Sequence, residues 1–170
     1  MRISEDAKEH RKTTRAAFLA WASNLGWQSP FSVTLTFKQA IMLNDSYVPL
    51  DDLGASKNVR YFLNILNRAA LGKSAVRRGK TLTCVGSLEY DQDVRLHGHF
   101  CLDKPTHLTD DQFHGLILTS WNRTLFGYLE VDVKPCTDVA GWLSYIAKYR
   151  TKPVYSDAID WMNVHTGSAV

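Results

Sequence analysis

The chain has 170 residues, of which 45% are hydrophobic and 22% are charged, and its formal net charge is +3. This apolar content is enough to bury one substantial core, and it excludes a chain that is disordered throughout. A charge of +3 permits nucleic-acid binding without requiring it, so the placement of the cations matters more than their number.

The cysteines and the apolar runs indicate the compartment. Cys84, Cys101 and Cys136 are odd in number and form no C-x-x-C pair, which is typical of reduced thiols in a cytosolic protein. No apolar run approaches the ~18 residues that cross a bilayer, and no apolar segment follows the charged N-terminus as it does in a signal peptide. We therefore expect a cytoplasmic protein with no membrane partner.

Hydrophobic periodicity predicts two helices and one strand in the first part of the chain. The first helix begins at the N-cap Ser4 and stops at Gly26. Residues 31–37 alternate large apolar side chains with hydroxyls, which is typical of a strand with one face on the core. An irregular or partly helical connection is expected over 39–55, and then a helix that Ser56 caps and Gly72 ends.

Four cations follow this helix on a segment that is expected to be a loop: Lys73, Arg77, Arg78 and Lys80. Two interpretations stay open, a solvated linker and a grip on the backbone of single-stranded DNA. The run Gly72-Lys73-Ser74 is not a P-loop, because Asn67 stands where that motif has its first glycine and a helix precedes it where a strand is required.

A pair of histidines, His97 and His99, lies on a strand expected over 94–102. Residues two apart on a strand share a face, so the two imidazoles form a potential metal clamp, although six histidines in the chain also allow the pair to arise by chance. The preceding strand is expected over 81–90. An odd number of residues in the intervening turn puts Glu89 on the histidine face, and a two-residue turn puts it on the opposite face.

In the last third of the chain, the residue pattern predicts a helix over 109–122, a strand over 127–134 and a helix that begins at Asp138 and ends at Pro153. On the last helix Tyr145 and Tyr149 share a face, with Lys148 beside them and Lys152 one turn further on. An amphipathic helix whose tyrosines pack as half-buried aromatic side chains is the other interpretation of this pattern.

Taken together, three motifs resemble the HUH endonucleases, and specifically the rolling-circle replication initiators. They occur in family order: Phe31–Phe37 is similar to the first motif, His97-Gly98-His99 to the second, and Tyr145-Ile146-Ala147-Lys148-Tyr149 to the third. The resemblance is strongest to the two-tyrosine branch of phage initiators. One residue departs from the pattern, since Gly98 stands where the family usually has a bulky hydrophobic side chain.

The resemblance implies a metal site and a nucleophile. Glu89 would complete a site with His97 and His99 for Mn²⁺ or Mg²⁺. Zn²⁺ is the alternative metal, but the three cysteines are not spaced like the ligands of a structural zinc site. Tyr145 would attack a DNA phosphate to form a 5′-phosphotyrosine, with Lys148 steadying the phenolate or the phosphate and Tyr149 acting in a second transfer. The DNA-binding cations would be Lys73, Arg77, Arg78, Lys80 and Lys152.

The expected fold is α+β, with a central antiparallel sheet of four to five strands, helices packed on one face and the other face open to DNA. We expect a single domain over 1–170, made of an N-terminal helix (1–28), a catalytic core (29–153) and a C-terminal tail (154–170). The family's substrate is single-stranded or hairpin DNA at a replication origin, and its partners include a host helicase and polymerase.

Two alternative functions stay open: a transposase-like strand transferase of the same superfamily, and a non-catalytic module that binds single-stranded nucleic acid on the same fold. The second would be expected to carry an aromatic pair on its strands for base stacking, and the sequence shows no such pair.

Overall fold

A computed structural model describes residues 5–91, 94–148 and 159–167. In chain order its elements are α1 (Glu5–Ser23), β1 (Pro30–Phe37), β2 (Ala40–Leu43), β3 (Ser46–Pro49), α2 (Asp52–Leu71), α3 (Lys73–Arg78), β4 (Thr83–Asp91), β5 (Val94–Asp103), α4 (Asp110–Asn122), β6 (Gly127–Pro135), α5 (Val139–Ile146), the short 3-10 helix η2 (Trp161–Asn163) and β7 (His165–Thr166).

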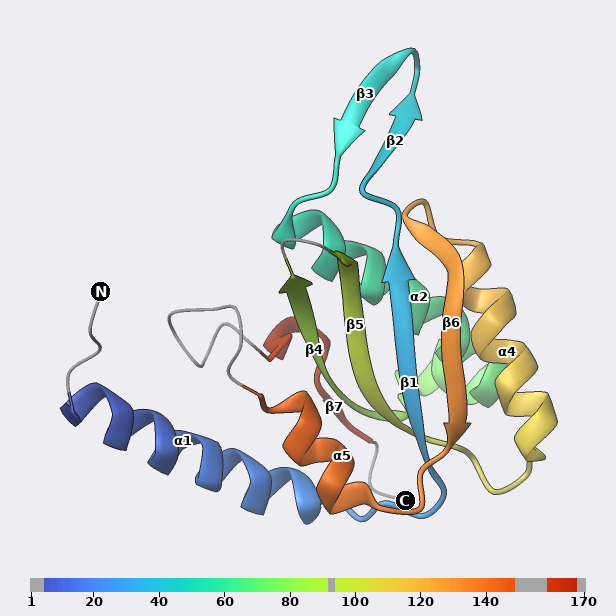
Figure 1. Cartoon of the computed structure of the whole chain (residues 1–170). Helices are drawn as coiled ribbons and strands as arrows, with labels where there is room; N and C mark the ends of the chain where they lie inside the picture. The colour runs from blue at the N-terminus through green and yellow to red at the C-terminus, as the bar shows by residue number, and fades with distance from the viewer. Residues whose placement is uncertain (1–4, 92–93, 149–158, 168–170) are drawn as a thin grey trace.

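The centre of the fold is a five-stranded sheet in the order β6-β1-β5-β4-β7, in which every neighbouring pair is antiparallel (Figure 1). The predicted α+β class and the antiparallel sheet of four to five strands are confirmed. No helix within the described ranges is both long and apolar enough to cross a membrane.

The main core lies between the sheet and the helices α2 and α4. The alternating apolar residues of β1 all face this side, and the rings at its two ends meet α4: Phe31 lies 5.2 Å from Phe113, and Phe37 lies 4.9 Å from Trp121. Fully burying one such side chain contributes roughly 1.5–3 kcal/mol. The period-two pattern of residues 31–37 therefore defines both the strand and the face that the helices cover.

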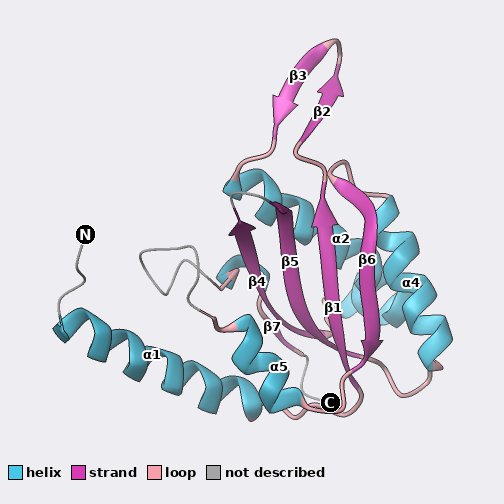
Figure 2. Ribbon diagram, viewed as in Figure 1, coloured by secondary structure: helices cyan, strands magenta, loops and turns pink. Residues whose placement is uncertain are grey.

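A second, smaller core occupies part of the opposite face. Val85 and Cys101 of the sheet pack there against Leu143 and Ile146 of α5 and Phe18 of α1. The expectation that helices cover one face and leave the other open is therefore incomplete, because α1 and α5 cover the side of β4 and β5. In Figure 2 no helix lies in front of β1 and β6 on this face.

The connection expected to be irregular over 39–55 is a β-hairpin, and this prediction was wrong. Strands β2 and β3 pair through Ile41↔Val48 and project from the sheet (Figure 2). Asn44 and Asp45 have positive φ angles of 47° and 60°, the left-handed backbone that a two-residue hairpin turn requires. These two residue types tolerate that conformation, so the sequence did contain the turn signal.

Two predictions about the next helices also need correction. Asp51, rather than Ser56, caps α2 by accepting the backbone N–H of Gly54 at 2.6 Å. Ser56 is instead buried inside the helix, where its hydroxyl donates to Asp160. The cationic segment expected to be a loop contains the short helix α3, which ends at Gly79. The predicted end of α2 at Gly72 is confirmed.

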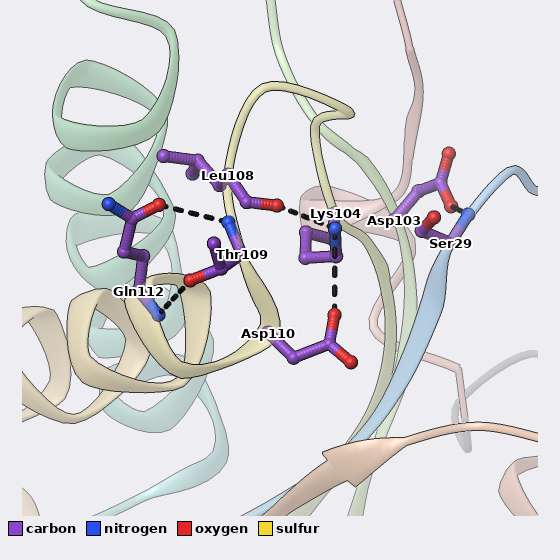
Figure 3. A network of polar contacts seen from close by, with 7 residues as sticks. All are labelled: Ser29, Asp103, Lys104, Leu108, Thr109, Asp110 and Gln112. Atoms are coloured by element: carbon purple, nitrogen blue, oxygen red, sulfur yellow. Dashed lines mark hydrogen bonds and ion pairs between the residues drawn. The ribbon is translucent and has the colours of Figure 1, made fainter.

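The end of β5 is tied to its neighbours by a polar network (Figure 3). The Asp103 carboxylate accepts the backbone N–H of Ser29 at 2.8 Å, and the Lys104 ammonium donates to the Leu108 carbonyl at 2.7 Å. Thr109 caps α4 by exchanging hydrogen bonds with Gln112, as its predicted position at the helix start implies.

The C-terminal segment returns to the sheet. β7 pairs with the beginning of β4, and Asp160 and Asn163 are buried against α2. The Asp160 carboxylate accepts from the Ser56 hydroxyl at 2.7 Å and from the Asn163 amide at 2.6 Å. This buried network holds the segment 159–167 on the core.

Candidate active site

The histidines of β5 lie in the middle of the sheet, between β1 and β4. In the register, Thr34 and Thr36 of β1 are opposite His99 and His97, while Glu89 of β4 is opposite His97. Directly opposite residues share a face, so Glu89 and both histidines lie on one side of the sheet. Asp91 pairs with Val94, so two residues lie between the strands, yet a register shift between Glu89 and Asp91 puts Glu89 on the histidine face. The expectation that a two-residue turn sends Glu89 to the opposite face was therefore wrong, because it assumed a regular ladder.

His99 is buried, with 5% of its surface exposed, and both of its ring nitrogens have partners. Nδ1 lies 3.0 Å from the Thr34 hydroxyl, and Nε2 lies 3.0 Å from a Glu89 carboxylate oxygen. Burial lowers the pKa of His99, Glu89 opposes this effect, and the nearby His97 and Lys148 add to it. A lowered pKa favours the neutral imidazole, the form that binds metals.

Gly98 departs from the family pattern for a reason that the core makes clear. A Cβ added at Gly98 would overlap the Phe100 ring, and a Cβ at Gly86 on the neighbouring strand would overlap the same ring. Phe100 therefore fills the space over two glycines. A bulky residue between the histidines has no room here, and the burial it would supply comes from Phe100.

Tyr145 stands over this face from α5. Its ring centroid lies 5.0 Å from that of His99 in an edge-on arrangement, and it stacks on Trp142 at 5.2 Å with an interplanar angle of 4°. The Trp142 indole donates to the Phe100 carbonyl at 2.9 Å, which fixes the stack to β5. The half-buried aromatic contact weighed for this tyrosine is present, and it places the ring beside the histidines.

The predicted long helix that carries both tyrosines ends earlier than expected. Asp138 caps its beginning as predicted, but α5 stops at Ile146, before Lys148. The Lys148 ammonium lies 3.4 Å from the centroid of the Tyr145 ring. Tyr149, Lys152 and the expected helix end at Pro153 lie outside the described residues.

Arg15 of α1 holds the end of α5. Its guanidinium donates to the carbonyls of Ala147 at 3.2 Å and Ser144 at 3.1 Å, and to the Ser144 hydroxyl at 2.7 Å. A cation at a helix C-terminus satisfies carbonyls that lack partners within the helix and interacts favourably with the helix dipole. This contact between distant segments fixes the stretch that bears Tyr145 and Lys148.

The structure does not bring the α3 cations to this site. Lys73, Arg77, Arg78 and Lys80 precede the beginning of β4 at Thr83, whereas Glu89 lies six residues further along the strand. At ~3.3–3.4 Å per residue, the backbones of Thr83 and Glu89 are about 20 Å apart along the strand. Of the residues named from the sequence, those that meet here are therefore His97, His99, Glu89, Tyr145 and Lys148.

The side chains at this site fit the expected metal in part. As they stand, no three His, Cys, Asp or Glu side chains within the described ranges are grouped to hold a metal ion. Two donors nevertheless fit, because His99 Nε2 and the Glu89 oxygen are 3.0 Å apart, and two ligands of one cation at ~2.1 Å and right angles are also about 3.0 Å apart. His97 shares their face, with its ring centroid 5.5 Å from that of His99.

The Thr34 hydroxyl makes that fit compatible with both forms of His99. Without a metal, Nε2–H donates to Glu89 and Nδ1 accepts from the hydroxyl. With a metal, Nε2 has to be unprotonated, so Nδ1–H donates to the same hydroxyl.

The roles of Thr34, Trp142 and Arg15 were not predicted from the sequence. Of these three residues, only Thr34 had a feature in the sequence that indicated a role at the site, because it lies on the hydroxyl-bearing face of residues 31–37.

Comparisons with known proteins give one distant similarity. No protein-family profile and no curated protein sequence matches the chain. Among solved structures, the chain is similar to the N-terminal nuclease domain of non-structural protein 1 from minute virus of mice, with a TM-score of 0.35 and 11% identity.

The alignment covers 82% of this chain and 64% of the viral domain, so the chain spans slightly less than two thirds of that domain's length. The viral domain is described as having a unique Zn²⁺ coordination in its active-site pocket and a novel mode of DNA recognition at the origin of replication. A similarity at this level assigns neither a family nor an activity.

Proposed function

We propose that this protein is a tyrosine-dependent endonuclease that cuts and rejoins single-stranded DNA. The observation that carries the proposal is the meeting of a tyrosine, a lysine and a His/Glu pair from three separate elements: Tyr145 lies edge-on to His99, and His99 contacts Glu89. A nucleophile beside potential phosphate-polarising groups is the arrangement that phosphoryl transfer requires.

In the proposed reaction the Tyr145 oxygen attacks the scissile phosphorus and loses its proton. The bond from phosphorus to the 3′-oxygen breaks, the 3′-oxygen takes up a proton, and the 5′-phosphate stays on the tyrosine. Because one phosphodiester replaces another, the bond energy is conserved and a 3′-hydroxyl can later reverse the step. Lys148 would steady the negative charge on the phenolate or on the phosphate, which its place beside the ring allows.

A divalent cation fits this proposal. His97, His99 and Glu89 would hold Mn²⁺ or Mg²⁺, and the ion would supply polarisation of the scissile phosphate. The chain's own groups orient this site: Thr34 fixes the His99 ring, and the Trp142 stack fixes the Tyr145 ring.

The wider biological role follows from the sequence resemblance. We propose that one domain over 1–170 nicks single-stranded or hairpin DNA at a replication origin and starts rolling-circle replication of a phage or plasmid in the cytoplasm. A host helicase and polymerase would extend the free 3′-end. Tyr149 would take the DNA in a second transfer, with Lys152 and the α3 cations contacting the strand further from the cut.

The test is covalent capture. Single-stranded oligonucleotides are incubated with the protein and Mn²⁺, and a denaturing gel resolves protein with attached DNA. We expect an adduct that Tyr145→Phe abolishes and that His97→Ala and His99→Ala each reduce to background, while the protein with Tyr145→Phe still binds the oligonucleotide.

The chain offers matched controls on other elements. Tyr47→Phe removes an exposed hydroxyl on the β2–β3 hairpin, and His114→Ala removes an exposed imidazole on α4. Both should leave the adduct unchanged. An adduct that survives in Tyr145→Phe, with mass spectrometry placing the DNA elsewhere, would refute the assignment of the nucleophile; binding without any adduct would refute the activity.

A further inference from the structure

A cation and an aromatic ring meet on the open half of the histidine face. The guanidinium carbon of Arg95 lies 4.2 Å from the centroid of the Tyr128 ring. Arg95 is two residues before His97 on β5, so their side chains share a face. Tyr128 follows Gly127, which pairs with Phe37 at the end of β1. The contact therefore crosses over the end of β1 and joins β5 to β6.

The pair lies close to the candidate active site. Two residues along a strand correspond to ~6.6–6.8 Å, so the backbone of Arg95 is that far from the backbone of His97. Arg95 is exposed, and α1 and α5 cover the side of β4 and β5 rather than β1 and β6 (Figure 2). A strand of DNA bound at Tyr145 and His97 can continue over this part of the sheet.

The Tyr128 ring holds the guanidinium, and the described part of the chain supplies no ion pair to it. Within the described ranges no carboxylate forms an ion pair with Arg95, and Asp132 of β6 pairs with Lys134 at 2.8 Å. A guanidinium stacked on a ring keeps its N–H donors at the rim, where they can contact a phosphate in a two-pronged geometry. Because the ring fixes the plane of the guanidinium, less side-chain entropy is lost on binding.

We infer that Arg95, positioned by Tyr128, binds a backbone phosphate of the single-stranded DNA next to the phosphate that is cut. The inference rests on the proposed function, because it names a substrate contact of that same site. It assigns the nearest backbone contact to β5 and β6, whereas the sequence had pointed to the cations that follow α2.

The test separates strand binding from cleavage by using protein in which Tyr145→Phe blocks the reaction. Fluorescence anisotropy with a labelled oligothymidylate measures the dissociation constant at several salt concentrations. Arg95→Gln should weaken binding by about 10- to 100-fold and reduce the slope of log K against log salt by about 0.7, the value for one phosphate contact on a single strand.

Two further variants test the ring. Arg95→Lys keeps the charge and should retain the salt slope while losing part of the affinity. Tyr128→Leu should weaken binding several-fold, and Tyr128→Phe, which keeps the ring, should not weaken it. Thermal melting of each variant confirms that the sheet is intact.

Lys134→Gln is the matched control, since it removes one cation from the same face that is already paired with Asp132. Equal effects of Arg95→Gln and Lys134→Gln would overturn the inference, even if the unmodified protein forms its adduct. Failure of the unblocked protein to form an adduct, with the Arg95→Gln effect retained, would instead refute the nuclease activity and leave the phosphate contact standing. Absence of binding to the oligothymidylate would overturn the contact as well.

Discussion

Thr34→Val tests whether the hydroxyl beside His99 organises the candidate site. Valine keeps the branched shape but leaves His99 Nδ1 buried without its partner at 3.0 Å. An unpaired buried polar group costs about 1–3 kcal/mol, and at about 2 kcal/mol a chain of this size melts roughly 4–8 °C lower. Loss of a group that orients a ligand histidine also weakens metal binding by about 10- to 100-fold.

Differential scanning fluorimetry and titration with Mn²⁺ measure the two effects of Thr34→Val. Thr34→Ser is the control because it keeps a hydroxyl at the same position, and it should retain most of the melting temperature and the metal affinity. If Thr34→Val and Thr34→Ser melt at the same temperature, the hydroxyl does not stabilise His99. If they also bind Mn²⁺ equally, Thr34 has no role in orienting the ring.

Three further predictions concern the surroundings of the site. Arg15→Gln removes donors to the Ser144 and Ala147 carbonyls, so we expect the protein to melt several degrees lower and to form its DNA adduct more slowly without weaker DNA binding. Asp160→Asn puts an amide where two donors converge, and chemical denaturation should show a loss of about 2 kcal/mol. Burial, and then Arg60, lower the pKa of His165 below 6.5, so the unfolded chain binds a proton at this residue more readily than the folded chain. The free energy of unfolding should therefore fall as the pH drops below 6.5. Thermal melts across this pH range should show that His165→Gln makes the dependence flatter.

The regular elements could be predicted because local pattern and tertiary environment agree. In β1 the alternation of large apolar and hydroxyl residues matches a strand with the main core on one side, and in α4 the cap at Thr109 has the partner that a capping box requires. The side of the sheet on which Glu89 lies stayed open, because it depends on a register shift between β4 and β5. Like the strand and the cap, the histidine face followed from its local pattern, a period of two. These features need only neighbours along the chain.

Two of the missed features, the cap of α2 and the end of α5, depend on contacts between distant segments. Ser56 has the residue type of a helix cap, but its hydroxyl is used by Asp160, more than a hundred residues away, and Asp51 takes the cap. The hairpin of β2 and β3 is local, and it was missed although Asn44 and Asp45 tolerate the left-handed backbone of its two-residue turn. The end of α5 could not be predicted either, since Arg15 satisfies its carbonyls from another helix.

Phe100 couples the two sides of the sheet. On the core side its ring fills the space over Gly86 and Gly98, which belong to the two strands that carry Glu89 and the histidines. On the other side its carbonyl accepts the Trp142 indole, and Trp142 carries the stacked ring of Tyr145. The position of the candidate nucleophile is therefore set by the same strand that carries the histidines, which is why a helix as short as α5 can hold Tyr145 in place.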